Sequence, residues 1–90
     1  MIARRYVVSG RVQRVGFRQF VVLAAKRLGV AGWTRNRHDG AVEVFAQAEA
    51  DVMEKLAAEL SVGPAWARVE RLDVEEQNVD PAIVDFSVRW

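Results

Sequence analysis

The chain has 90 residues, of which 51% are apolar, and it contains no cysteine. Its 13 basic residues, mostly arginine, nearly balance 12 acidic residues, so the net charge is +1. A chain of this length can bury one core, and we expect a single domain over residues 1–90. The even charge balance argues against a general nucleic-acid binder, which carries a basic face. The lack of cysteine excludes disulfides, thiolate zinc sites and cysteine-phosphatase chemistry.

No export or membrane signature is visible in the chain. The first residues, "MIARRYVVSG", hold two arginines but no apolar run long enough for a signal peptide. No other stretch approaches the roughly 20 apolar residues of a membrane span. We therefore expect a cytoplasmic protein.

The first elements predicted by the sequence are a strand and a helix. Residues 5–12 alternate apolar side chains with arginines, which is typical of a strand. Residues 17–28 place apolar side chains three to four positions apart, which predicts an amphipathic helix. Gly29 follows where a helix commonly has its C-terminal glycine, so the helix is expected to end there.

A hairpin is predicted next. Residues 30–37 and 41–47 are both extended in pattern, and Asp39-Gly40 lies between them. Both of these turn residues tolerate positive φ, which makes the pair a strong hairpin signal. His38, in the same turn, lacks the carboxylate or cysteine companions of a metal ligand, so we expect it to be an exposed turn residue.

The last part of the chain predicts a helix and two strands. Residues 50–60 are helical in pattern, and residues 66–76 form a strand whose alternation slips near Val69, as at a β-bulge. Residues 83–90 alternate again and predict a final strand. The order is β-α-β-β-α-β plus a short final strand, which predicts an α+β, ferredoxin-like fold with an antiparallel sheet and both helices on one face.

The corner between the first strand and the first helix has the composition of an anion site. A helix N-terminus leaves several backbone N–H groups unpaired and carries the positive end of the helix dipole. Gly16 lets the backbone approach an anion closely, and the Arg18 guanidinium can bind two phosphate oxygens. The alternative is that Gly16 makes a turn and Arg18 is solvated. A cation is unfavourable at a helix N-terminus, which slightly favours an anionic partner.

Two segments, "GRVQRVGFR" and "GVAGWTRNRHDGAVEVFAQA", resemble the acylphosphatase family. Its hallmarks are a G-x-V-Q-G-V-x-F-R loop and a G-W-V-x-N-x-x-D-G-x-V-E segment. The resemblance extends to the Gly-Pro-x-x-A-x-V stretch at 63–69 and to the ending "FSVRW". It implies a small ferredoxin-like enzyme that hydrolyses the carboxyl–phosphate bond of acyl phosphates without metal or cofactor.

By position, the resemblance implies that the loop and Arg18 hold the substrate phosphate and that Asn36 orients the attacking water. The expected phosphate-binding loop is Gln13, Arg14, Val15, Gly16, Phe17 and Arg18. The chemistry is reasonable, because a carboxylate leaves readily and positioning with charge stabilisation can supply most of the catalysis. From the residues alone, Asn36 could equally shape the hairpin turn. The resemblance favours the catalytic role.

Arg14 stands where the family pattern usually has glycine. If this residue needs positive φ, a side chain there costs about 1–3 kcal/mol and predicts a weaker or inactive enzyme. If the guanidinium instead extends over the pocket, it predicts a tighter phosphate site. The sequence leaves both outcomes open.

Two other classes of function compete with the enzyme. One is a non-catalytic acyl-phosphate or anion-binding module, suggested by Arg14. The other is RNA binding, which uses the same element order, but residues 41–47 have one aromatic residue and an acidic one where such domains carry aromatics. We therefore expect an acyl phosphate as the partner, no nucleic acid, no membrane and a monomer. The tryptophans are expected to pack in the core or at its rim.

Overall fold

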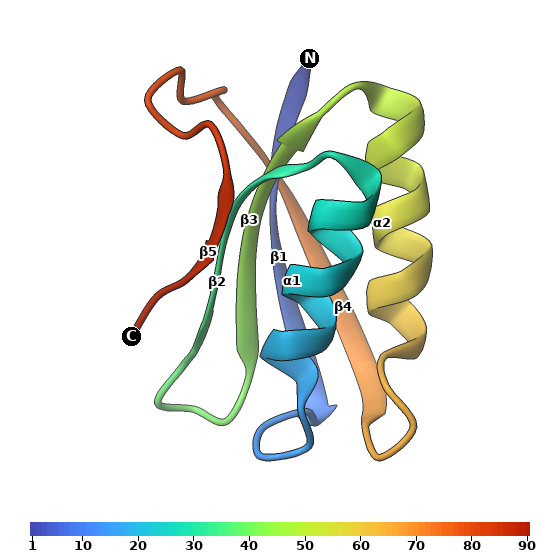
Figure 1. The fold of residues 1–90 in the computed structure, drawn as a ribbon. Coiled ribbons are helices and arrows are strands. Elements are labelled where there is room, and N and C mark those ends of the chain that lie inside the picture. The colour runs from blue at the N-terminus through green and yellow to red at the C-terminus, as the bar shows by residue number, and fades with distance from the viewer.

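The computed structural model describes all 90 residues and has seven regular elements. The elements, in chain order, are β1 (Ile2–Arg11), α1 (Phe17–Leu28), β2 (Ala31–Asn36), β3 (Val42–Ala48), α2 (Ala50–Val62), β4 (Arg68–Gln77) and β5 (Phe86–Val88). The strands form one sheet in the order β4-β1-β3-β2-β5, and both helices cover the same face of it (Figure 1). The predicted ferredoxin-like fold is confirmed. Neither α1 nor α2 has the length and the apolar character that a membrane-spanning helix needs.

The sheet is mixed, and this differs from the expected antiparallel sheet. The first four strands of the sheet order pair antiparallel, but β5 pairs parallel to β2. The strand expected over residues 83–90 is also shorter, because only Phe86–Val88 find partners on β2. Val84 and Trp90, on either side, are 83% and 92% exposed. Alternation alone therefore overstated this strand, since its length depends on the partner edge.

The core lies between the helices and the sheet. The helix α1 buries Phe17 and Val21, and α2 buries Met53, Leu56 and Leu60. They pack on apolar side chains of the two central strands, which are Tyr6, Val8, Val42, Val44 and Ala46. Every residue of β3 is buried, and β3 pairs with β1 along one edge and with β2 along the other. This rigid centre carries the loops at the ends of the strands.

The predicted irregularity near Val69 is confirmed as a register shift between β1 and β4. Ser9 pairs with Arg71 and Gly10 pairs with Val69, so Glu70 is the extra residue. A Cβ at Gly10 would lie 2.2 Å from the carbonyl oxygen of Arg68, so only glycine allows this approach. The bulge lies at the end of β1 that leads into the loop before α1 (Figure 1). The β2–β3 hairpin reaches the same end of the sheet.

Candidate active site

The helix α1 begins without any of the usual capping groups. Gly16 is its N-cap residue at φ 79°, no side chain caps it, and the first turn holds no acidic residue. The backbone N–H groups of residues 13–18 donate no hydrogen bond to a backbone carbonyl. Unpaired N–H groups and the positive end of the helix dipole therefore coincide at this loop, which suits an anion.

Arg14 adopts the left-handed conformation that its place in the loop suggested. At φ 63° it has the only positive φ among the non-glycine residues. This conformation brings the side chain of an L-residue close to its own backbone, at a cost of roughly 1–2 kcal/mol. The residue nevertheless lines the cavity beside α1 and forms no ion pair with a carboxylate. The positive φ and the position beside the cavity, which the sequence left open as alternatives, therefore occur together at Arg14.

Arg18 lies in the first turn of α1 and has no acidic partner either. Its guanidinium carbon is 4.6 Å from the ring centroid of Trp90, which is a cation–π contact. This contact leaves the N–H groups of the guanidinium without a carboxylate to neutralise them. The residue is thus a positively charged fork held at a helix N-terminus.

Asn36 is the last residue of β2 and is half-buried. Its Oδ1 atom is buried and accepts no hydrogen bond from any group of the protein. A buried acceptor without a donor costs about 1–3 kcal/mol, so such groups occur where a ligand or water completes them. Asn36 does not form the turn contacts considered as the alternative, because the hydrogen bonds of the turn come from Arg37 and Asp39.

One cavity of ≈ 350 Å³ collects most of the predicted residues. Its lining is Val12, Arg14, Gly16, Phe17, Arg18, Gln19, Asn36, Val88 and Trp90. Its lining has two arginines and no acidic side chain, so it favours an anionic ligand. Val15 does not line it and instead packs against the core. A second cavity, of ≈ 420 Å³, adjoins the first and shares Asn36 and Trp90 with it.

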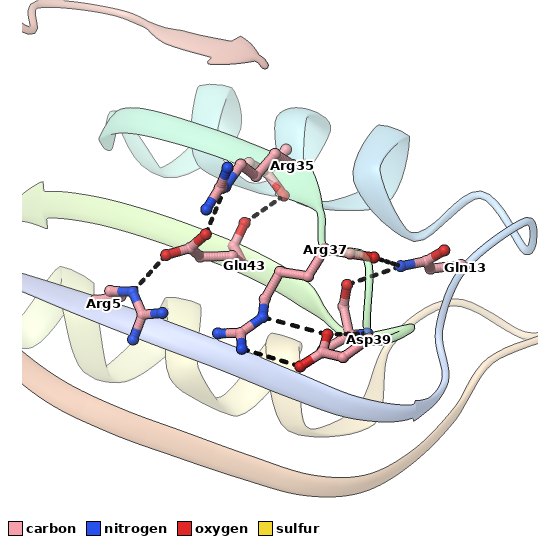
Figure 2. Close-up of polar contacts among 8 residues, drawn as sticks. Arg5, Gln13, Arg35, Arg37, Asp39 and Glu43 are labelled. Carbon is pink, nitrogen blue, oxygen red and sulfur yellow. Dashed lines mark hydrogen bonds and ion pairs between the residues drawn. The ribbon is translucent and has the colours of Figure 1, made fainter. Parts of the chain in front are cut away.

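Gln13 does not line the cavity either, because its side chain is hydrogen-bonded to the β2–β3 hairpin. Its Nε2 donates to the carbonyl oxygens of Arg37, at 2.8 Å, and Ala41, at 2.9 Å (Figure 2). These two residues form the base of the β2–β3 hairpin. The side chain of Gln13 therefore joins the loop before α1 to the hairpin turn that follows Asn36. Sequence reasoning missed this contact, because nothing local to Gln13 points to its partners.

The hairpin turn itself is held by Asp39, as its turn role predicted. The Asp39 carboxylate accepts hydrogen bonds from the Ala41 N–H, at 3.1 Å, and from the Arg37 guanidinium, at 2.9 and 3.2 Å. These contacts hold the pKa of Asp39 below its usual range. The hydrogen bond from the Ala41 N–H contributes most to this lowering, and the bonds from Arg37 come next. His38 is exposed in the turn, as expected.

Glu43 is a further polar residue that sequence reasoning left without a role. It lies on β3, on the sheet face opposite the helices, and is only 4% exposed. Its carboxylate accepts hydrogen bonds from Arg5 on β1 and from Arg35, at 2.5 Å, on β2 (Figure 2). Burial alone would raise the pKa of Glu43, but these two arginines outweigh burial and lower the pKa. Because Arg35 precedes Asn36, this network supports the strand that ends at the cavity.

The three tryptophans have different environments. Trp33 stacks on Phe45 with ring centroids 6.1 Å apart, so its predicted packing is confirmed. Trp66 is 78% exposed, so packing is not its role. Trp90 forms the rim of the cavity, although the sequence offered no signal for that position beyond its aromatic character. No group of three or more His, Asp or Glu side chains is placed to hold a metal ion.

Together these features define a small ferredoxin-like α+β protein with an electropositive cavity at a helix N-terminus. The family model described as Acylphosphatase matches residues 4–88. An acylphosphatase of Bifidobacterium longum is 42% identical over 90 residues, covering 99% of this chain and 93% of the relative. One from Koribacter versatilis is 47% identical over 85 residues, covering 94% of this chain and 77% of the relative.

The structural comparison agrees with the sequence comparison. The crystal structure of acylphosphatase from Bacillus subtilis matches with a TM-score of 0.95 at 33% identity and covers 100% of both chains. The chain therefore belongs to the acylphosphatase family and is an enzyme that hydrolyses acyl phosphates.

Proposed function

We propose that the loop of residues 13–18 and Arg18 hold the phosphoryl group of an acyl phosphate while Asn36 places the attacking water. One observation carries the proposal. Arg18, which lacks an acidic partner, and Asn36, whose buried Oδ1 is unpaired, line a single cavity at the N-terminus of α1. The free N–H groups and the helix dipole would stabilise charge on the phosphoryl oxygens, and the guanidinium would bind two of these oxygens at once.

In this reaction the water oxygen attacks phosphorus, and the bond between phosphorus and the acyl oxygen breaks. The carboxylate leaves with the bonding electron pair, and the proton of the water passes to an oxygen of the phosphoryl group. A carboxylate of pKa about 4 leaves without help from a general acid. Positioning and charge stabilisation therefore supply the catalysis. The products are a carboxylate and inorganic phosphate.

Release of phosphate from benzoyl phosphate in excess chelator tests this proposal. Arg18→Ala should lower kcat/KM by about 100- to 1000-fold, the usual effect of removing a donor to a developing anion. It should also raise the inhibition constant of inorganic phosphate, because the same guanidinium holds the ground state. Lys26→Ala is the matched control, since it removes one positive charge from the other end of α1. Wild-type protein no faster than Arg18→Ala would overturn the proposal.

A non-catalytic anion-binding module, the alternative that Arg14 suggests from the sequence, does not fit a chain that belongs to the acylphosphatase family over nearly its full length. The φ of 63° at Arg14 is a strained conformation at a position where the family pattern has glycine, so its effect is expected on the rate of hydrolysis and not on the class of protein.

A further inference from the structure

Gln13 links the two parts of the candidate site that the chain keeps 18 or more residues apart. It lies in the loop before α1, but its amide is directed at the β2–β3 hairpin (Figure 2). A glutamine amide has two N–H donors, and Gln13 uses its Nε2 for two carbonyl oxygens, those of Arg37 at 2.8 Å and Ala41 at 2.9 Å. Its donor capacity is therefore fully used on the hairpin.

The two carbonyls lie next to the Asn36–Val42 pair, on the side of the hairpin turn. Arg37 directly follows Asn36, and Ala41 directly precedes Val42, the register partner of Asn36. The Arg37 N–H donates to the Ala41 carbonyl at 2.8 Å and closes the same base. The Gln13 amide thus holds the backbone next to Asn36 on both strands.

We infer that Gln13 is a positioning residue that fixes Asn36 relative to the phosphate-binding loop. The inference rests on the proposed function, in which the loop holds the phosphoryl group and Asn36 holds the water. Attack requires the water and the phosphorus to be aligned, and a misplacement of about 1 Å can cost about 100-fold in rate. Without Gln13, the loop loses the two hydrogen bonds that join it to the hairpin beside Asn36, where the water is placed in the proposed function.

The test separates turnover from phosphate binding. Gln13→Ala and Gln13→Glu both remove the donors, and the glutamate also places a carboxylate against two carbonyl oxygens. With benzoyl phosphate as substrate, we expect kcat to fall by about 10- to 100-fold. The inhibition constant of inorganic phosphate should stay within about 2-fold, because the N–H groups of the loop and Arg18 are untouched.

Gln47 provides the matched control. Its Nε2 likewise donates to two carbonyl oxygens, those of Asp80 at 2.8 Å and Ile83 at 2.9 Å, but at the other end of the sheet. Gln47→Ala should leave kcat within about 2-fold of wild type, since distant sites act independently. If Gln13→Ala keeps wild-type kcat, or loses no more than Gln47→Ala, the inference is wrong.

A double-mutant cycle with Asn36→Ala shows whether Gln13 acts through Asn36. If it does, Gln13→Ala slows the Asn36→Ala enzyme by much less than it slows the wild type. Equal slowing in both backgrounds would overturn the inference while leaving the proposed function intact. Absence of turnover in the wild type, or full turnover in Asn36→Ala, would overturn the proposed function and the inference with it.

Discussion

Gln13 and Gln47 make the same kind of contact at opposite ends of the sheet, yet they connect different segments of the chain. Each amide donates from Nε2 to two backbone carbonyls of a distant segment. Gln47 is 3% exposed and also accepts a hydrogen bond from the Asp80 N–H at 2.8 Å, so it anchors the connection before β5. Gln13 is half-buried and joins two loops beside the cavity. One contact type therefore secures the fold at one end and, in the proposed mechanism, fixes the phosphate-binding loop relative to Asn36 at the other.

The arginines also fall into two groups, those that are paired with a carboxylate and those that are not. On the open face of the sheet, Arg5 and Arg35 share the Glu43 carboxylate, and Arg37 pairs with Asp39. In the cavity, Arg14 and Arg18 have no carboxylate partner. Paired arginines are neutralised and support strands, whereas unpaired ones beside free N–H groups produce a site for an anion.

The largest effect on stability is expected for Glu43→Gln. The change leaves Arg5 and Arg35 without their shared carboxylate, and breaking a fully buried pair costs about 3–5 kcal/mol. The arginine side chains are 30% and 47% exposed, so we expect a loss of about 2 kcal/mol at pH 7 by chemical denaturation. Glu70→Gln, on exposed β4, is the control and should change stability by less than about 0.5 kcal/mol. A loss no larger than this control would contradict the pairing.

The same residue predicts a pH dependence of stability. Its two arginines lower the pKa of Glu43 in the folded chain below its usual 4.5. A lowered pKa stabilises the fold above pH 4.5, and this contribution is lost as the pH falls through the folded-state value. The difference in unfolding free energy between wild type and Glu43→Gln should therefore be constant at neutral pH and shrink below pH 4.5. A difference in unfolding free energy that stays unchanged down to about pH 3 would contradict this account.

A smaller effect, confined to stability, is expected for Gln47→Ala. It removes three hydrogen bonds, but the backbone groups around Asp80 are near the surface and can be hydrated instead. We expect a loss of about 1–2 kcal/mol in thermal or chemical unfolding, with kcat within about 2-fold of wild type. A large fall in kcat would remove the contrast between the two ends of the sheet.

The smallest effect is expected for Arg14→Gly, and it should have opposite signs for stability and binding. Glycine removes the strain of a left-handed residue, so the chain should gain about 1 kcal/mol in unfolding free energy. Loss of the guanidinium should raise the inhibition constant of phosphate by about 2- to 5-fold. Arg14→Ala separates the two effects, since it loses the charge but keeps the strain. Equal stability of the glycine and alanine variants would show that φ 63° is not strained.

Much of the fold could be predicted because its signals are local. The helix over residues 17–28 has the predicted bounds, since its apolar spacing and Gly29 lie within the segment itself. The Asp39-Gly40 turn was predicted on the same basis. The length and direction of β5 could not be predicted from its own residues. They depend on parallel pairing with β2, a strand formed by a distant part of the chain.

The candidate site was only partly predictable for a related reason. The glycine of the family pattern raises positive φ at Arg14 as one of two open alternatives, and the structure has Arg14 at φ 63°. The partners of Gln13 lie 24 and 28 residues away, and Trp90 reaches Arg18 only through the parallel pairing of β5. Residue types at a corner can indicate an anion, but the contacts that align the corner with Asn36 come from tertiary structure.

In the proposed mechanism, the loop before α1 holds the phosphoryl group and Asn36, at the end of β2, places the water. Steady-state hydrolysis of benzoyl phosphate by Asn36→Ala, with phosphate as a competitive inhibitor, tests it most directly, and Asn78→Ala is the control. We expect kcat to fall about 100-fold while the inhibition constant of phosphate stays within about 2-fold of wild type. An unchanged kcat, or a loss of phosphate binding that parallels the loss of turnover, would contradict the account.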